Sequence, residues 1–517
     1  MMEFCAPVDD IFFSLRALGA EELTDWDGDL AREIGEHFGR FAQDVLAPIN
    51  ATGDAQGCRF ENGRVYMPDG CKDAFAQLAA DGWQGLTTPE EFGGQGLSPL
   101  MLGVTSEIFS GANHSMQMVT GLVPGAVRTL LNFGTDYQKN TFIPKLAKGD
   151  MIATMCLTEP GAGSDLARIR TQAVQTGDGW SISGEKIFIS GADQDISDDI
   201  FHLVLARTSD DGLKGLSLFI VQGRVNVTRI EEKMGLHASP TCQIAFDDTP
   251  AQLIGKEGQG LMAMFTMMNH ARIDVALQGV AHCTRAHDIA NRYASGRIQG
   301  QINGQDARLI DHDDVGRMID DIDAMAMMSR GFAHLALIEL EKNERPDLVE
   351  FLTPLAKIYG SEAGVRGAEI GMQVLGGYGY LTEYSLDQTY RDARITMIYE
   401  GANGIHTRAL ATRCVKIGSA DAFSIMLDDL GTQKDVLGLW EKALGMVKSK
   451  NAVKLAHYFA QVAMHTLVIA VANQYEKHAD QALDPIRVKR VVTHAKINAR
   501  AEISKAIIQM ECVENLG

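Results

Sequence analysis

Residues 151–165 read Met151-Ile-Ala-Thr-Met-Cys-Leu-Thr-Glu-Pro-Gly-Ala-Gly-Ser-Asp165, and at this stretch the pattern of the chain changes. From about residue 30 to 148, the apolar residues follow a helical period. The stretch itself is a short apolar run that ends in a Pro-Gly turn, and similar β-rich runs continue to about residue 250. No helical stretch in this region is long enough for a parallel crossover. The middle of the chain is therefore predicted to form an antiparallel sheet or barrel.

A helical period returns after residue 258 and continues through the last part of the chain. Helices are expected at about 315–342 and 352–375. Apolar stripes at helical spacing are Leu261, Met264, Phe265 and Met268, then Val436, Leu439, Trp440 and Leu444. The predicted fold is mainly α with a central antiparallel β domain. The expected domains are an N-terminal helical domain (1–150), a middle β domain (151–256), a helical domain (257–416) and a C-terminal helical extension (417–517).

The chain has 517 residues and a formal net charge of −20. A balance this negative argues against binding to nucleic acid or to an anionic membrane surface. The longest uninterrupted apolar runs, such as 467–472, are far shorter than the roughly 18 residues that indicate a membrane span. The start of the chain also lacks a basic region followed by an apolar stretch. We therefore expect a cytoplasmic protein with neither a nucleic acid nor a membrane as partner.

Residue motifs exclude several common kinds of site. The sequence contains no GxxxxGK[ST], HExxH or GxSxG and no complete GxGxxG. None of the eight cysteines pairs in a CxxC, so neither a zinc site nor a disulfide framework is expected, and no metal is predicted. Three local clusters remain, at 155–165, 373–380 and 399–404, and their Gly-rich backbone suits a planar or phosphate-bearing ligand. Each cluster also has a purely structural interpretation. In the order given, these are a Pro-Gly turn, a helix C-cap and a solvated surface glutamate.

Glu400 lies between the apolar run 395–398 and a Gly-rich turn. Desolvation at such a place raises the pKa of a carboxyl group and makes it a better general base near neutral pH.

Five segments stand in the order and spacing of a known family. They are Cys156-Leu-Thr-Glu-Pro-Gly-Ala-Gly-Ser-Asp165, Gly184-Glu-Lys-Ile-Phe-Ile-Ser190, Gln373-Val-Leu-Gly-Gly377, Tyr390-Arg-Asp-Ala-Arg394 and Ile398-Tyr-Glu-Gly401. From about residue 30 to 416, the sequence thereby resembles the acyl-CoA dehydrogenases, which are FAD enzymes that oxidise acyl-CoA thioesters. The resemblance implies a helical domain, a β-barrel domain and a four-helix domain, here followed by the C-terminal extension. It also implies FAD as the cofactor.

The resemblance assigns roles to individual residues. Glu400 matches the catalytic base, and Ala271 occupies the place where some members carry that glutamate instead. The implied FAD-binding residues are Met155, Leu157, Thr158, Phe188, Ser190, Arg297, Gln373, Gly376, Gly377, Ala402 and Gly404. The implied substrate-binding residues are Ser164, Asn269, Arg272 and Gly401.

Arg297 matches an arginine that reaches the FAD of a neighbouring subunit, so a homodimer or homotetramer is expected. The sequence departs from the family at two places. Ala402 stands where a threonine is frequent, and Arg297 is followed by Ile-Gln-Gly and a polar insertion through Asp306 instead of Phe-Gly.

The implied reaction is α,β-dehydrogenation of an acyl-CoA to a trans-2-enoyl-CoA. In it, Glu400 takes the α proton, the flavin takes the hydride and an electron-transfer flavoprotein is the electron acceptor. The short segments 235–241, 267–272 and 297–300 resemble a branch of the family with longer bacterial members. This resemblance favours 3-methylmercaptopropionyl-CoA, from dimethylsulfoniopropionate degradation, as the substrate. Another short or medium acyl-CoA and an acyl-CoA oxidase remain alternatives. A DNA-associated flavoprotein of the alkylation response is a more distant one, because the net charge of −20 opposes DNA binding.

Overall fold

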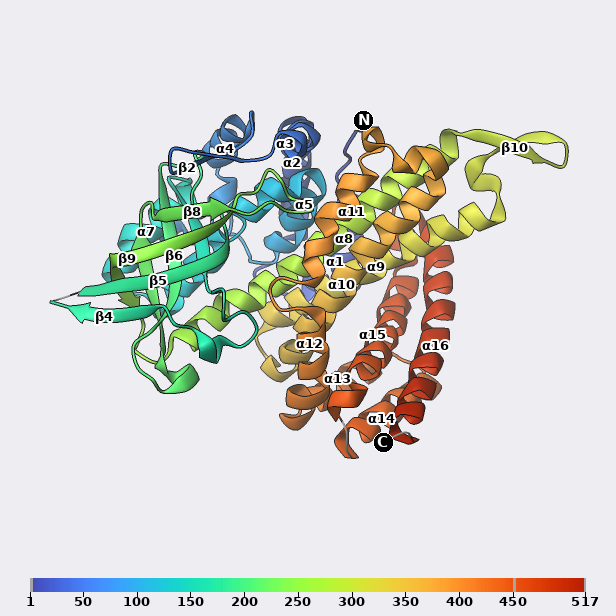
Figure 1. Ribbon diagram of the computed structural model, residues 1–517. Coiled ribbons are helices and arrows are strands. Elements are labelled where there is room, and N and C mark those ends of the chain that lie inside the picture. Colours follow the sequence, from blue (N-terminus) through green and yellow to red (C-terminus); the bar gives the residue numbers. More distant parts are fainter. Residues whose placement is uncertain (1–2, 178, 450–451, 516–517) are drawn as a thin grey trace. The chain divides into compact units, whose positions relative to one another are not determined.

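The computed structural model describes residues 3–177, 179–449 and 452–515, and the chain forms two compact units (Figure 1). Unit 1 comprises Met1–Arg40, Gly103–Gly111 and Arg272–Gly517, and unit 2 comprises Phe41–Leu102 and Ala112–Ala271. The first two residues of the N-terminal stretch considered above lie outside the described residues.

Unit 2 is built around a β-barrel. Its strands are β3 (Met151–Cys156), β4 (Gln172–Thr176), β5 (Gly179–Ser190), β6 (Asp199–Arg207), β7 (Leu216–Gln222), β8 (Asn226–Ile230) and β9 (Thr241–Ile254). The order β6-β4-β5-β9-β7 closes on itself because β7 also pairs with β6, while β3 extends the sheet beside β6 and β8 pairs with β9. The buried residues Ile182, Val204, Phe219 and Ile244 belong to its core. The predicted central β domain is thus confirmed as a barrel.

Most pairings in the barrel are antiparallel, as predicted, but β3 runs parallel to β6 from Met151–Asp199 to Cys156–Val204. A single parallel pair also joins β4 to β6 at Gln172 and Arg207. The chain between β3 and β6 contains β4 and β5, which supplies the long connection that a parallel pair requires without a helical crossover.

Helices precede the barrel and make up most of the chain after it. The helices before the barrel are α1 (Val8–Ala17), α2 (Gly28–Phe41), α3 (Asn50–Gln56), α4 (Cys71–Ala80), α5 (Met101–Thr120), α6 (Val123–Phe133) and α7 (Asp136–Lys148), with a small hairpin of β1 (Arg59–Glu61) and β2 (Arg64–Tyr66). Those after it are α8 (Gly260–Gly296), α9 (Asp313–Lys342), α10 (Pro346–Leu375), α11 (Leu386–Arg394), α12 (Asn403–Ala409), α13 (Ser419–Asp429), α14 (Lys434–Ser449), α15 (Ala452–Lys477) and α16 (Pro485–Asn515). The mainly α fold is confirmed.

The expected apolar stripes are partly right. Val436, Trp440 and Leu444 of α14 are buried, and the Trp440 ring lies 5.1 Å from that of Phe423. On α8, by contrast, Phe265 is 40% exposed, and the buried positions are 263, 264, 267 and 268. The buried face of α8 is therefore rotated by one position relative to the predicted stripe. As a result Phe265 lies beside the buried face and stays exposed.

Helix α15 is apolar and long enough to cross a membrane by length and composition, and 78% of its most apolar window is buried within the protein. This helix contains no long uninterrupted apolar run, because polar residues such as Thr466 interrupt its sequence. In unit 1 it packs against α14 and α16, as a core helix does (Figure 1).

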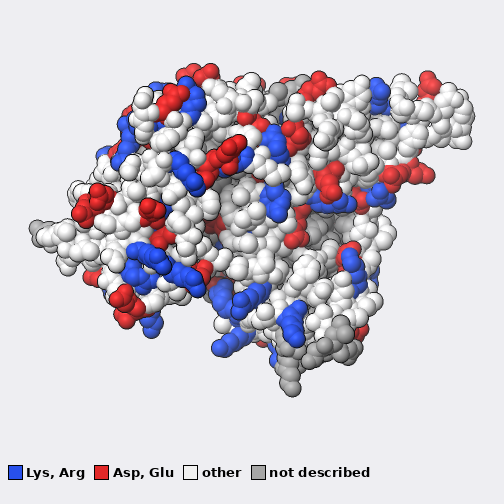
Figure 2. All heavy atoms as spheres, viewed as in Figure 1, with Lys and Arg blue, Asp and Glu red and all other residues white. Residues whose placement is uncertain are grey.

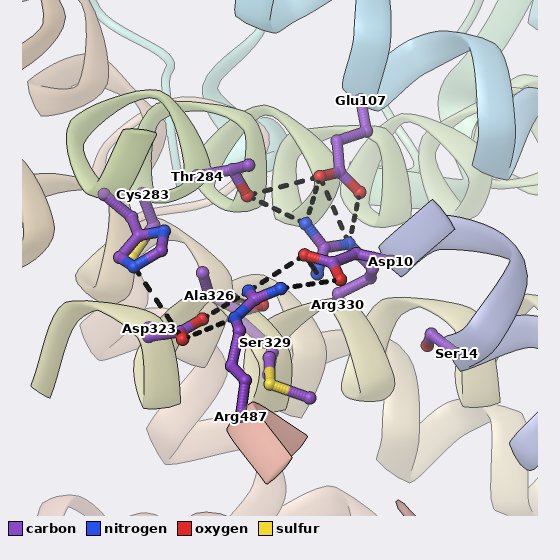
Figure 3. A network of polar contacts seen from close by, with 12 residues as sticks. Asp10, Ser14, Glu107, Cys283, Thr284, Asp323, Ala326, Ser329, Arg330 and Arg487 are labelled. Atoms are coloured by element: carbon purple, nitrogen blue, oxygen red, sulfur yellow. Dashed lines mark hydrogen bonds and ion pairs between the residues drawn. The ribbon is translucent and has the colours of Figure 1, made fainter. Parts of the chain in front are cut away.

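A buried ionic network joins distant segments of unit 1 (Figure 3). Arg330 of α9 donates to Glu107 at 2.6 Å and to the Thr284 hydroxyl at 2.9 Å. Arg487 of α16 donates to Asp323 of α9 at 2.6 Å and to Asp10 of α1 at 3.0 Å. Arg487 thus joins helix α16 both to α9 and to α1 by arginine–carboxylate pairs.

Candidate active site

Glu400 lies in a short loop between a 3-10 turn at Ile395–Met397 and helix α12. Its backbone is left-handed, with φ 52°, and Gly401 follows with φ 97°. A left-handed residue with a side chain costs roughly 1–2 kcal/mol, so the surrounding structure must hold Glu400 in place. At position 401 only glycine fits, because a Cβ there would lie 2.6 Å from Nε2 of His406.

The Glu400 carboxyl group is desolvated, as expected from its place in the sequence. Its Oε2 atom is buried and has no hydrogen-bond partner in the described part of the chain. Burial raises the pKa of Glu400 to about 7, against the opposing positive charges of Arg272 and Lys357. Such a carboxyl group can take up a proton near neutral pH.

The backbone of the Glu400 loop is held by side chains. Nζ of Lys357, on α10, donates to the carbonyl oxygen of Gly401 at 2.8 Å and to Oδ1 of Asn403 at 2.9 Å. Nε2 of His406 lies 3.0 Å from the carbonyl oxygen of Glu400. Burial lowers the pKa of His406 to about 3, so the ring is neutral and donates this hydrogen bond through Nε2–H.

Helix α8 supports the same loop from residues near Arg272. The Tyr399 hydroxyl donates to Oε1 of Gln278, and Nε2 of Gln278 donates to Asp274 at 2.9 Å. Burial lowers the pKa of Arg272, while the negative charge of Glu400 opposes that shift. The predicted substrate-binding Arg272 and the predicted base are thus electrostatically coupled within unit 1.

Unit 2 holds the predicted flavin-contacting residues at one end of β3. Nζ of Lys186 donates to the carbonyl oxygen of Leu157 at 3.0 Å and to Oε1 of Glu159 at 2.8 Å. The backbone N–H of Ile187 donates to the carbonyl oxygen of Thr158 at 2.9 Å. The segment after β3 is therefore fixed to β5, which carries Phe188 and Ser190.

Several of these residues leave groups open for a ligand. The Phe188 side chain is 60% exposed and its backbone has φ 60°. The hydroxyls of Thr158, Ser164 and Ser190 have no hydrogen-bond partner among residues 3–177, 179–449 and 452–515. An exposed aromatic ring and open hydroxyls within one unit are groups that fit a planar, polar-edged ring such as the flavin of FAD.

In unit 1 the glycines after α10 are open as well. A Cβ added to Gly376, Gly377 or Gly404 would meet nothing within 4 Å, and Gly376 has φ 60°. Backbone N–H groups left open by glycine are suited to phosphate. Arg297 is exposed, and its guanidinium lies 5.6 Å from the centroid of the Tyr378 ring. These residues fit the phosphate-bearing part of FAD.

The predicted site residues are divided between the two units. Unit 1 places the catalytic candidate with its neighbours and holds Arg272, Arg297, Gln373, Gly376, Gly377, Glu400, Gly401, Ala402 and Gly404. Unit 2 holds Met155, Leu157, Thr158, Ser164, Phe188, Ser190 and Asn269. The sequence reasoning missed Lys357, His406 and Lys186. The sequence holds one sign of Lys357, which is the only charged residue in the mostly apolar segment 351–359. A lone charge in a segment expected to be buried indicates a lysine with a specific partner.

The polar insertion after Arg297 forms an exposed hairpin of β10 (Ile298–Ile302) and β11 (Gln305–Arg308). His312 lies with Nε2 2.7 Å from the carbonyl oxygen of Gln299 and so ties the hairpin to the start of α9. The Ile298 side chain is 61% exposed. The segment that replaces Phe-Gly is thus an ordered element of its own.

Comparison with protein families finds three successive matches. The N-terminal domain of acyl-CoA dehydrogenases matches residues 29–150, the middle domain matches 154–249, and the C-terminal domain matches 258–415. The chain belongs to the acyl-CoA dehydrogenase family. It is accordingly an oxidoreductase of the acyl-CoA dehydrogenase type, and membership of this family confirms FAD as the expected cofactor.

Individual acyl-CoA dehydrogenases are also similar to this chain in sequence or in fold. The chain is 40% identical over 450 residues to 3-methylmercaptopropionyl-CoA dehydrogenase of Ruegeria pomeroyi, covering 80% of this chain and 76% of that protein. It is 32% identical to a broad-specificity linear acyl-CoA dehydrogenase of Mycobacterium tuberculosis, over 76% of this chain and 71% of that one. A structure of an acyl-CoA dehydrogenase from Bacillus anthracis, solved with FAD, has a TM-score of 0.77 and covers 94% of this chain and 88% of its own, with 21% identity.

Proposed function

We propose that Glu400 is the base that removes the proton α to the thioester carbonyl of an acyl-CoA, giving a trans-2-enoyl-CoA. The observation that carries this proposal is the buried Oε2 atom of Glu400, which has no partner in the described residues and belongs to a carboxyl group whose pKa burial raises to about 7. Bound FAD supplies the acceptor for the hydride that leaves the β carbon. The C–H bond at the α carbon breaks with its proton going to Oε2, and the electron pair forms the double bond as the β hydride departs.

The protein supplies the base in a usable protonation state. A fully desolvated carboxylate without positive neighbours would stay protonated, and the charges of Arg272 and Lys357 favour the ionised form. Glu400 is therefore partly ionised at neutral pH while its free oxygen is kept from water. The neutral ring of His406 and the amine of Lys357 hold the loop without competing for Oε2.

We infer 3-methylmercaptopropionyl-CoA as the leading substrate. The 40% identity to the Ruegeria pomeroyi enzyme supports this substrate, and the 32% identity to the broad-specificity linear acyl-CoA dehydrogenase supports a short or medium linear acyl-CoA as the alternative. We further propose an electron-transfer flavoprotein as the electron acceptor and a homodimer or homotetramer as the assembly, with Arg297 reaching the FAD of the neighbouring subunit.

The charge distribution disfavours the DNA-binding alternative. The face in Figure 2 carries both Lys and Arg side chains and Asp and Glu side chains among mostly uncharged residues, and the chain has a net charge of −20. Nucleic-acid binding draws on positive charge, and a net charge of −20 opposes it.

The substrate proposal is tested by adding a panel of acyl-CoAs to the FAD-loaded protein without oxygen and following the flavin absorbance. We expect 3-methylmercaptopropionyl-CoA to bleach the flavin fastest, with butyryl-CoA and octanoyl-CoA as comparison substrates. Faster bleaching by a linear acyl-CoA would assign that acyl-CoA as the substrate instead. Bleaching by none of the acyl-CoAs would contradict the proposed dehydrogenation. Rapid peroxide formation with oxygen during turnover would instead indicate an acyl-CoA oxidase.

A further inference from the structure

Lys357 is a buried amine in the middle of helix α10, and burial lowers its pKa to about 7. It is 0% exposed, and its neighbours on that helix include the buried Leu355, Ala356 and Ile358. Burying an ammonium group costs several kcal/mol unless it is paired and hydrogen-bonded. Nζ of Lys357 donates to the Gly401 carbonyl oxygen and to Oδ1 of Asn403, so the buried amine is held at the Glu400 loop.

The acceptors of Lys357 are themselves fixed. Nδ2 of Asn403 donates to Oγ of Ser361 at 3.1 Å and to Oε1 of Glu362 at 3.2 Å, which turns Oδ1 of the amide toward Lys357. Lys357 and Ser361 lie four residues apart, on the same face of α10. Helix α10 therefore holds both the Gly401 carbonyl and the first residue of α12.

Two carbonyl groups in the left-handed part of the loop accept a side-chain hydrogen bond. The Glu400 carbonyl accepts from His406 and the Gly401 carbonyl accepts from Lys357. The left-handed backbone of Glu400 decides where its side chain points, and it is unfavourable unless such contacts maintain it. We propose that Lys357 is a positioning residue, which keeps Glu400 in its reactive orientation by holding the carbonyl of Gly401.

This inference rests on the proposed role of Glu400. It adds a second, electrostatic effect, because the charge of Lys357 lowers the pKa of Glu400. The other charged groups that act on Glu400 are Arg272 and Asp274, and those that act on Lys357 are Glu400, Arg272 and Glu362. Removing the Lys357 charge should therefore raise the pKa of the base while the other groups stay in place.

The test uses Lys357→Met in the FAD-loaded enzyme, because methionine keeps the length and apolar stem but cannot donate. We expect kcat to fall on the order of 10–100-fold, as a misplaced catalytic group does, with KM changed less than about threefold. The pH at which kcat/KM is half-maximal should rise. Lys342→Met is the control, since Lys342 pairs with the exposed Glu22 at 3.0 Å, and we expect its kinetics to be unchanged.

A double substitution separates positioning from general damage to the fold. In a Glu400→Gln background, Lys357→Met should change the residual rate by less than about threefold, because the carboxylate that Lys357 is proposed to position has already been removed. An equal loss in both backgrounds, or wild-type kcat and pH dependence for Lys357→Met alone, would overturn the inference. If Lys357→Met does not retain FAD, Lys357→Gln serves instead, with a smaller loss of kcat expected because glutamine still donates.

The two proposals fail in different ways. Near-normal turnover by Glu400→Gln would remove the proposed function. A large loss in Glu400→Gln together with a normal Lys357→Met enzyme would leave that function intact and refute only the role of Lys357.

Discussion

Lys186 and Glu159 form a buried ion pair at 2.8 Å in unit 2, and the same lysine donates to the carbonyl oxygen of Leu157. The carboxylate of Glu159 also accepts the backbone N–H groups of Arg170 and Thr171 at 2.7 and 3.0 Å. Lys357 makes the same kind of contact in unit 1, where its Nζ donates to the carbonyl oxygen of Gly401. Each unit thus uses one buried lysine to hold the backbone of a loop that carries predicted site residues.

The lysine of unit 2 should stabilise both the fold and the FAD site. We expect Lys186→Met to lower the free energy of unfolding by about 3–5 kcal/mol, because the buried Glu159 carboxylate loses its positively charged partner and keeps only the two backbone N–H donors named above. FAD affinity should fall as well, since the Leu157 carbonyl loses its donor. Thermal unfolding and FAD titration measure the two effects. Lys214→Met, at an exposed position of the same unit, is the control, and equal behaviour of both variants would refute this role.

The pH dependence of the reaction should follow Glu400. The base acts only when deprotonated, and its pKa is about 7, so kcat/KM should fall tenfold per pH unit well below pH 7 and level off above it. Steady-state rates between pH 5.5 and 8.5, corrected for substrate ionisation, measure this. A profile that is flat across this range, or that declines with rising pH, would contradict the assignment.

The buried carboxyl group should also reduce stability. Because its pKa is higher in the folded protein than in the unfolded chain, the folded state loses stability as pH rises from about 4.5 to 7. We therefore expect Glu400→Gln to be more stable than the wild type by about 1–3 kcal/mol at pH 8 and nearly equal to it at pH 4.5. Thermal unfolding of the FAD-loaded proteins at both pH values tests this. A difference independent of pH would show that the charge of Glu400 is not responsible.

The network in Figure 3 makes a separate prediction for the C-terminal helices. Arg487 holds Asp323, whose side chain is 1% exposed, and Asp10. Its replacement by methionine should cost about 3–5 kcal/mol, because the Asp323 charge stays buried and loses this partner. Arg490→Met is the control, since Arg490 and its pair with Asp320 are more exposed, and we expect a change below about 1 kcal/mol. Denaturant unfolding compares the two, and equal losses would contradict the account.

Much of the fold could be predicted because it depends on local patterns. The strands from β3 to β9 and helices such as α9 and α10 follow from the spacing of apolar residues, and the desolvation of Glu400 follows from its apolar and glycine neighbours. The parallel pairing of β3 with β6 was missed because register between distant strands leaves no local pattern. The exposure of Phe265 was missed because periodicity identifies a helix better than it identifies which neighbouring position faces the core.

The supporting residues of the site were missed for the same physical reason. Lys357 contacts a carbonyl 44 positions later in the chain, and Lys186 contacts one 29 positions earlier. A buried lysine is paired by tertiary packing, so its partner cannot be identified from spacing alone. The predicted base could be found because the Ile398-Tyr-Glu-Gly401 segment matches the catalytic segment of the acyl-CoA dehydrogenases, whereas the distant groups that tune its pKa, Arg272 and Lys357, leave no local pattern.

The central claim, that Glu400 takes the α proton, is tested most directly by comparing wild type and Glu400→Gln in anaerobic single-turnover mixing with the best acyl-CoA. Both proteins should carry FAD. We expect the rate of flavin bleaching to fall by about 10²–10⁴-fold in the variant, the usual contribution of a general base. Bleaching at a near wild-type rate by FAD-loaded Glu400→Gln would contradict the claim.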